Sequence, residues 1–164
     1  MRSVHTTALT VLLILAATGR LAAAAEKPPE KQKFPGPVVT QLLEGWGGLA
    51  WGASLDDFKK KYPEAKKNEG GRWLTGKEDE IAGVKVTVQY TFNKKDQLQM
   101  LTFIPGEKDG KTFRQALDKA GALRDGKDNW QSKGITFRVV PIADSTQIAA
   151  AINAKYADPA AKKP

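Results

Sequence analysis

The stretch VKVTVQYTFNKKDQLQMLTFI, residues 84–104, decides the fold class. Apolar and polar residues alternate from Val84 to Phe92, which is the pattern of a β-strand with one buried face. The polar run NKKD, residues 93–96, predicts a turn. The apolar run after it predicts a strand that returns antiparallel to the first. The core of the protein is therefore predicted to contain a β-hairpin.

The turn leaves the register of this hairpin open. A four-residue turn pairs Val88 with Leu101, whereas a bulged turn pairs Tyr90 with Met100. The choice decides which aromatic side chains of the hairpin face solvent.

A short amphipathic helix is predicted before the hairpin, within GGLAWGASLDDFKKKYP, residues 47–63. Ser54 stands at the N-cap position, and Asp57 follows three residues later in the pattern of a capping box. Pro63 ends the helix, because a residue that precedes proline disfavours the helical conformation. The glycines loosely fit a dinucleotide-binding fingerprint, but the helix begins only at Ser54. We therefore interpret them as the turn that starts the fold.

The second half of the chain repeats this order. KTFRQALDKAG, residues 111–121, predicts a second helix with Thr112 as the cap, Gln115 as its partner and Gly121 at the end. ITFRVVPI, residues 135–142, predicts another strand.

One element of the second half is ambiguous. The alanines within residues 146–156 favour a helix by propensity, whereas the repeat favours a strand, which we predict. An offset of 50 residues matches Phe92, Gln97 and Leu98 with Ile142, Gln147 and Ile148.

These elements predict an α+β fold. Two helix-then-β-hairpin units, at about 49–105 and 106–154, share one antiparallel sheet with both helices on one face. The first unit carries an insertion around TGKEDEIAG, residues 75–83. Together they form a single domain over residues 38–156.

The ends of the chain predict export. Residues 1–25 combine a basic start, a short apolar run and small residues before Glu26, which is the layout of a secretory signal peptide. Residues 26–37 contain four prolines and read as an extended linker, and residues 157–164 read as a disordered tail. We expect a periplasmic or secreted protein with no transmembrane helix in its mature form.

Composition excludes several kinds of chemistry. The chain has no cysteine, and its one histidine, His5, lies in the predicted signal peptide. Without these residue types the mature chain lacks Ser-His-Asp and Cys-His nucleophilic sites and the usual zinc ligands. Glu78, Asp79 and Glu80 leave a carboxylate-dependent hydrolase as a minor alternative. We predict no catalytic residue, no cofactor and no metal.

WGASLDDFKKKYP and YTFNKKDQLQMLTFI resemble small exported α+β domains of the β-lactamase-inhibitor-protein-like and SmpA/OmlA-like group. The resemblance covers residues 49–152 and implies an antiparallel sheet whose open face binds proteins. This chain lacks the lipid-carrying cysteine of the lipoproteins and the disulfides of the secreted inhibitors, so neither specific activity is carried over.

The charge of the chain indicates the kind of partner. Removal of residues 1–25 leaves 24 Lys and Arg against 18 Asp and Glu, a net charge of +6. Such a surface attracts anions, and export argues against nucleic acid. We therefore predict a non-catalytic module that contacts an envelope or secreted protein through its sheet face and aromatic residues. The partner is expected to be an acidic protein or an anionic envelope polymer. A carrier or sensor of a small anionic or apolar ligand is the alternative.

Large aromatic and basic residues are the candidate contacts with this partner, because aromatic side chains bury a large area at low entropic cost. Trp46 and Trp51, near the entry to the domain, are expected to be surface anchors. The candidate partner-binding residues are Trp46, Trp51, Lys59, Lys60, Trp73, Tyr90 and Trp130.

Overall fold

The computed structural model describes residues 34–106, 109–143 and 146–159. The predicted signal peptide, residues 26–33 of the predicted linker and residues 160–164 of the predicted tail lie outside the described residues. The elements in chain order are α1 (Pro37–Glu44), β1 (Gly45–Trp46), β2 (Leu49–Ala50), α2 (Leu55–Lys61), β3 (Lys66–Lys67), β4 (Trp73–Ile81), β5 (Val84–Phe92), β6 (Leu98–Pro105), α3 (Gly110–Lys119), β7 (Asn129–Ser132), β8 (Ile135–Ala143) and β9 (Thr146–Asn153).

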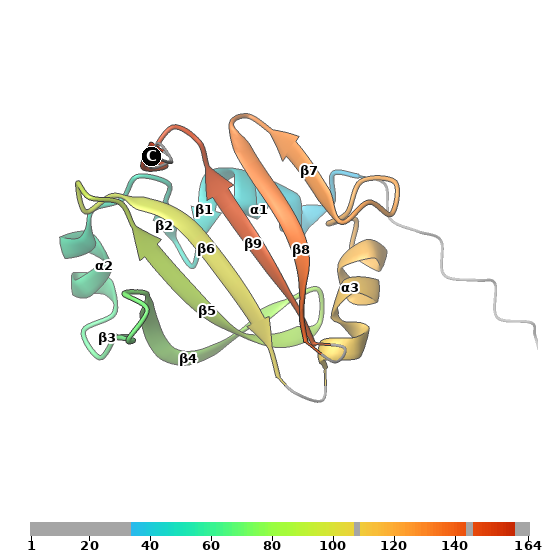
Figure 1. The fold of residues 1–164 in the computed structure, drawn as a ribbon, viewed down its shortest axis with the longest axis horizontal. Coiled ribbons are helices and arrows are strands. Elements are labelled where there is room, and N and C mark those ends of the chain that lie inside the picture. The colour runs from blue at the N-terminus through green and yellow to red at the C-terminus, as the bar shows by residue number, and fades with distance from the viewer. Residues whose placement is uncertain (1–33, 107–108, 144–145, 160–164) are drawn as a thin grey trace, which may run out of the picture.

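Seven of the strands form one antiparallel sheet in the order β3-β4-β5-β6-β9-β8-β7, and β1 pairs with β2 in a separate small sheet. The two halves of the chain meet where β6 pairs with β9, with Thr102 opposite Ala150. Figure 1 shows α2 at one end of the large sheet, α3 at the other end and α1 behind the middle of the sheet. The predicted α+β class is confirmed.

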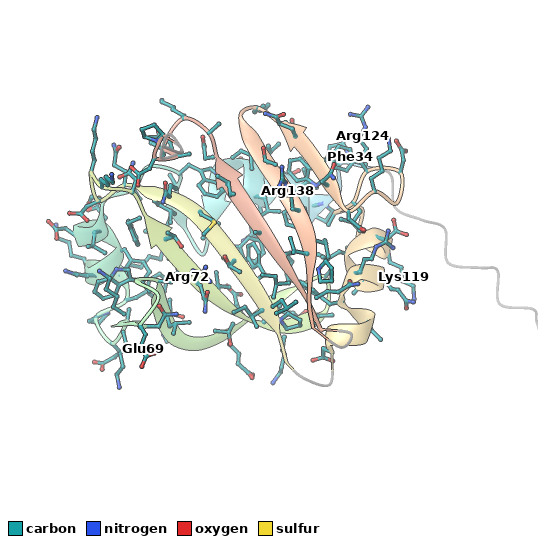
Figure 2. The ribbon with its side chains drawn as sticks, viewed as in Figure 1. Phe34, Glu69, Arg72, Lys119, Arg124 and Arg138 are labelled. Atoms are coloured by element: carbon teal, nitrogen blue, oxygen red, sulfur yellow. The ribbon has the colours of Figure 1, made fainter. Side chains whose placement is uncertain are left out.

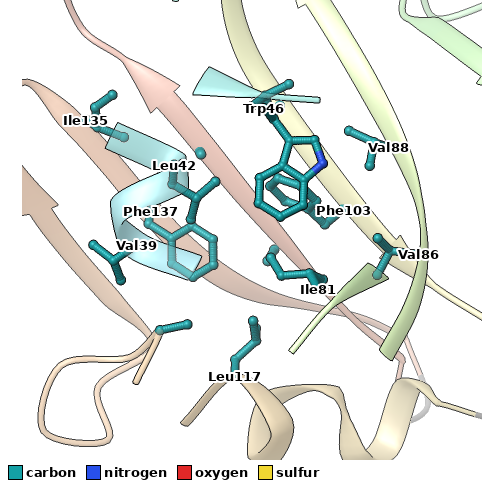
Figure 3. Packing of buried hydrophobic residues seen from close by; sticks show 14 of the residues in the cluster. Val39, Leu42, Trp46, Ile81, Val86, Val88, Phe103, Leu117, Ile135 and Phe137 are labelled. Carbon is teal, nitrogen blue, oxygen red and sulfur yellow. The ribbon is translucent and has the colours of Figure 1, made fainter. Parts of the chain in front are cut away.

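The core lies on the side of the sheet that carries the helices. Trp46 of the small sheet packs edge-on against Phe103 of β6, with the ring centroids 4.8 Å apart. Leu42 of α1 and Leu117 of α3 are fully buried in the same cluster as Phe137 of β8. Figure 3 shows these side chains converging over the sheet. Burial of such apolar area is the main driving force for this fold.

β9 is a strand although its sequence is rich in alanine. Ala149 and Ala151 are fully buried, and α3 packs against this strand. Small side chains leave room for a helix close to the sheet, so packing outweighs helix propensity here. The predicted strand at this position is confirmed.

The two helix starts differ in how well the sequence predicts them. The Ser54 side chain accepts a 3.1 Å hydrogen bond from the backbone N–H of Asp57, as predicted. The predicted cap at Thr112 is wrong, because α3 begins at Gly110 with Asp109 as its N-cap. The Thr112 hydroxyl instead donates to the Asp109 carbonyl at 3.1 Å.

Both predicted registers of the central hairpin are wrong, because Tyr90 pairs with Leu101. The Asn93 side-chain oxygen accepts hydrogen bonds from the backbone N–H groups of Lys95 and Gln97, each at 2.9 Å, which fixes the turn. The ladder then shifts by one residue at Gln99, because Phe92 pairs with Leu98 and Thr91 with Met100. A bulge of this kind adds a residue to one strand only.

The elements that were not predicted include α1, β4 and β7. β4 occupies the segment that was interpreted as an insertion, and β7 lies around Trp130. Phe34 packs against Trp130 with ring centroids 5.6 Å apart, so part of the predicted linker contacts the core. The first half of the chain thus places four strands of the large sheet after α2, and the second half places three after α3, rather than two in each half.

Candidate functional site

The large sheet has one face that none of the described helices or strands covers. This uncovered face points toward the viewer in Figure 1. Its side chains alternate with those of the core along the four central strands, although Thr102, at its centre, is itself only 3% exposed. The residues of the uncovered face are Thr87, Gln89 and Thr91 of β5, Met100, Thr102 and Ile104 of β6, Ile148, Ala150 and Ile152 of β9, and Thr136, Arg138 and Val140 of β8.

Cross-strand pairing arranges these residues in rows. One row runs from Gln89 through Thr102, Ala150 and Arg138 to Asn129 of β7. The next row places Met100 and Ile152 side by side, between threonines on the neighbouring strands. The centre of the uncovered face is therefore mainly aliphatic and its margins are polar, which is the anatomy of a protein-protein interface.

The aliphatic part of the uncovered face extends to a strongly exposed margin. Val140 is 41% exposed, and Ile142, near the end of β8, is 58% exposed. These are the large hydrophobic residues that stand out as exposed in the described part of the chain. Apolar side chains that are contiguous and exposed mark an interaction site more often than single ones do.

The uncovered face carries a cation that has no ion-pair partner in the described part of the chain. Arg138 is exposed on β8, and Figure 2 shows it in front of the sheet. Among the described residues no carboxylate forms an ion pair with it. Other charges at the margin are engaged: Arg72 donates to the Gln89 side chain at 3.1 Å, and Lys85 pairs with Glu78 at 3.1 Å.

Four of the candidate partner-binding residues lie in the core instead of on the surface. Trp46 is 3% exposed, and Trp51, Tyr90 and Trp130 are also buried. The expectation that Trp46 and Trp51 are surface anchors is wrong, because each indole N–H has an internal acceptor. Trp46 donates to Asp79 and Trp51 to the Leu42 carbonyl, both at 2.7 Å.

Tyr90 is held inside an aromatic group around Phe58 of α2. The ring centroids of Tyr90 and Phe58 are 5.0 Å apart, and those of Tyr90 and Tyr62 are 6.0 Å apart. Burial, followed by the neighbouring Tyr62, raises the pKa of Tyr90 far above its usual range. The phenol therefore stays protonated and neutral in the folded protein.

The remaining three candidates lie beside α2. Lys59 and Lys60 are exposed, and Trp73 is half-buried. The Lys59 ammonium lies 5.2 Å from the centroid of the Trp73 ring, a distance typical of a cation-π contact. This group is not part of the uncovered face, because Trp73 pairs with Tyr90, which points to the core side. A role for the three residues in partner binding stays a prediction.

The three consecutive carboxylates do not act together. Glu78 pairs opposite Thr87 and Glu80 opposite Lys85, whereas Asp79 pairs opposite the buried Val86. Asp79 therefore points to the other side of the sheet from its neighbours. In the described part of the chain, no group of three or more His, Cys, Asp or Glu residues is arranged to hold a metal ion.

None of the described helices is long and apolar enough to cross a membrane. Comparison of the chain with protein-family models, curated proteins and solved structures gives no match. The candidate site therefore rests on geometry and chemistry.

Sequence reasoning named the sheet face but missed the residues on it. Arg138, Val140 and Ile142 fall in a segment whose strand is correctly predicted, but the predicted contacts are aromatic and lysine residues instead. The signal was the apolar pair Val139-Val140 followed by Pro141, because two adjacent apolar residues in a strand put one on each face.

Proposed function

We propose that this protein is an exported, non-catalytic binding module whose uncovered face contacts an acidic protein of the cell envelope or of the extracellular space. The observation that carries the proposal is the combination on one sheet face of an aliphatic centre with the unpaired Arg138. An aliphatic surface of this kind is stabilised when a partner removes it from water. The export component rests on the sequence of residues 1–25.

The expected partner offers carboxylates beside aliphatic side chains. Arg138 stands in the same row as the small Ala150, so a carboxylate can approach its guanidinium without crossing a bulky neighbour. Bidentate pairs of this type give geometric specificity as well as affinity. The excess of Lys and Arg over Asp and Glu in the whole chain steers an acidic partner toward the protein.

We also infer that the two halves of the chain are copies of one unit. The support is the order of elements, since α2 precedes β4, β5 and β6 as α3 precedes β7, β8 and β9, with the two-residue β3 as an addition in the first half. In the sheet these strands run β4-β5-β6 and then β9-β8-β7, so the second half mirrors the first. Under this proposal the uncovered face is built jointly by both units.

Site-specific photo-crosslinking in the native cell envelope tests the proposed function. A photoreactive residue at Ile148 or Val140 is expected to capture one acidic protein, whereas the same residue at the exposed Lys127, in the loop before β7, is not. Arg138→Glu is expected to abolish the capture. Arg124→Glu makes the same charge change at an exposed arginine outside the strands and is expected to leave it intact. Equal capture from Lys127 would contradict the proposal.

A further inference from the structure

A polar hollow lies on the core side of the sheet, under an interruption in β4. The ladder between β4 and β5 breaks between Leu74 and Glu78, so residues 75–77 arch away from β5. Gly76 adopts φ +72° there, and a side chain at this position would meet open space. The hollow has a volume of about 200 Å³ and is lined by Tyr62, Thr75, Lys77, Glu78, Asp79, Val88 and Tyr90. We call it the Asp79 hollow.

The Asp79 carboxylate is held by two hydrogen bonds and has no cationic partner in the part of the chain that the structure describes. Its Oδ2 accepts a 2.7 Å hydrogen bond from the Trp46 indole, and its Oδ1 accepts a 2.9 Å bond from the backbone N–H of Glu80. No Lys or Arg among the described residues lies within ion-pair distance of it. A carboxylate offers about four acceptor positions, so the group retains capacity for another donor.

The two phenol groups of the hollow also present acceptors. The two hydroxyls lie together beside Gly47, and Tyr62 donates its proton to the Gly47 carbonyl at 2.9 Å. The Tyr62 proton is engaged within the protein, so this oxygen offers lone pairs to anything that enters, and the neutral Tyr90 oxygen beside it also carries lone pairs. Gly47 is required where the hydroxyls meet, because a Cβ there would lie 2.7 Å from the Tyr62 oxygen and 2.9 Å from the Tyr90 oxygen.

The chemical groups that line the hollow determine which kind of cation can bind there. Glu78 also lines the hollow, but its carboxylate pairs with Lys85. The carboxylate of Asp79 and the two neutral phenols fall short of the six or more oxygens that calcium requires. A primary ammonium has three N–H donors, which matches the acceptors on Asp79, Tyr62 and Tyr90. The buried Val88 side chain provides an apolar wall for a short alkyl chain. The volume is several times the roughly 30 Å³ that one water molecule takes up.

We propose that the Asp79 hollow binds a primary alkylammonium group, with Asp79 as the counter-ion and the Tyr62 and Tyr90 oxygens as acceptors. The group belongs either to a free amine or to a lysine side chain of another protein. This site lies on the opposite side of the sheet from the uncovered face, and it does not depend on the function proposed above.

NMR titration of the protein tests the proposal, with the indole resonance of Trp46 as the reporter because this N–H contacts Asp79 directly. Butylammonium and an Nα-acetylated lysine amide are the probes, and butanol is the uncharged control. We expect saturable shifts with at least one ammonium probe, in the range of about 1 mM, and none with butanol. Saturation by butylammonium alone assigns the free amine as the source, and saturation by the lysine derivative assigns a protein side chain.

Two variants make the test specific. Asp79→Asn retains an acceptor for the Trp46 indole but loses the charge, and it is expected to weaken binding about tenfold. Glu80→Gln removes a charge from the neighbouring residue, which points to the other side, and is expected to change the affinity less than about twofold. Lys77 is the cation among the lining residues and would repel a bound ammonium, so Lys77→Gln is expected to strengthen binding even where Asp79→Asn does not fold. Equal shifts with butanol, unchanged affinity in Asp79→Asn, or weaker binding in Lys77→Gln would overturn the proposal.

Discussion

The indole nitrogen of Trp46 donates a 2.7 Å hydrogen bond to the carboxylate of Asp79, a residue 33 positions further along the chain. The bond ties the small β1-β2 sheet to β4 of the large sheet. Trp46 is 3% exposed, so bulk water is a poor substitute acceptor for its N–H. The same carboxylate is the charged group of the Asp79 hollow, which couples the packing of the core to the chemistry of that site.

Removal of this acceptor is expected to destabilise the fold. Asp79→Ala leaves the Trp46 N–H without a partner and should lower the free energy of unfolding by about 1–3 kcal/mol. Asp79→Asn retains an acceptor and should cost less. Urea unfolding measures both values, and Glu80→Ala, at an exposed position of the same strand, should stay within about 0.5 kcal/mol of the wild type. A double-mutant cycle with Trp46→Phe should give a coupling of at least about 0.5 kcal/mol; purely additive effects would contradict the bond.

The buried phenol of Tyr90 predicts a loss of stability at alkaline pH. Its pKa is raised in the folded protein, so the unfolded chain releases the Tyr90 proton first, above a pH of about 10. Stability is unaffected by this group below that pH and falls above it, by about 1.4 kcal/mol per pH unit. The difference in unfolding free energy between wild type and Tyr90→Phe, measured from neutral pH to beyond the usual pKa of tyrosine, should therefore shrink as pH rises. A difference that is constant with pH would contradict the raised pKa.

The fold class could be predicted from the sequence because it depends on patterns that repeat locally. Alternation over Val84–Phe92 and the cap at Ser54 are set by neighbours within a few residues, and both are found as expected. β4 is not predicted, because most of its side chains are not buried and the bulge at residues 75–77 disturbs the alternation of apolar and polar residues. A bulge moves side chains to the other face, and a period-based reading then loses the strand.

The candidate site could not be predicted in the same way, because it is formed by residues that are far apart in the sequence. The sequence gives no sign that the Trp46 indole meets Asp79, because the two residues are joined only by the packing of β1 near β4. Large aromatic residues were interpreted as surface anchors, whereas a domain of this size needs them to fill its core. The uncovered face is defined by the absence of a covering element, and this can be judged only after the helices have been placed.

The two helix starts provide a direct comparison of caps. Ser54→Ala removes the acceptor for the Asp57 N–H and should destabilise the protein by about 1 kcal/mol. Thr112→Ala should cost less, because Thr112 lies inside the first turn of α3 and its hydroxyl caps no backbone N–H. Thermal or urea unfolding of the two variants measures the difference. Equal costs would show that Thr112 acts as a cap in solution.

Alanine substitutions at Gly52 and Gly83 allow the cost of backbone strain to be distinguished from the cost of steric overlap. Both adopt φ +78°, where a side chain costs about 1–2 kcal/mol. A Cβ on Gly83 meets open space, but a Cβ on Gly52 would lie 2.4 Å from the ring of Tyr156. Gly83→Ala should therefore lose only the backbone cost, whereas Gly52→Ala should lose about 1–3 kcal/mol more through overpacking.

The ring of Tyr156 accounts for this extra cost, so its removal should restore part of the stability. In the background of Gly52→Ala, the second change Tyr156→Ala makes space for the new methyl group, and the two changes together should cost less than the sum of the single ones. Urea unfolding of the single and double variants gives the coupling. If Gly52→Ala and Gly83→Ala proved equally destabilising, the close approach of Tyr156 to Gly52 would not persist in solution.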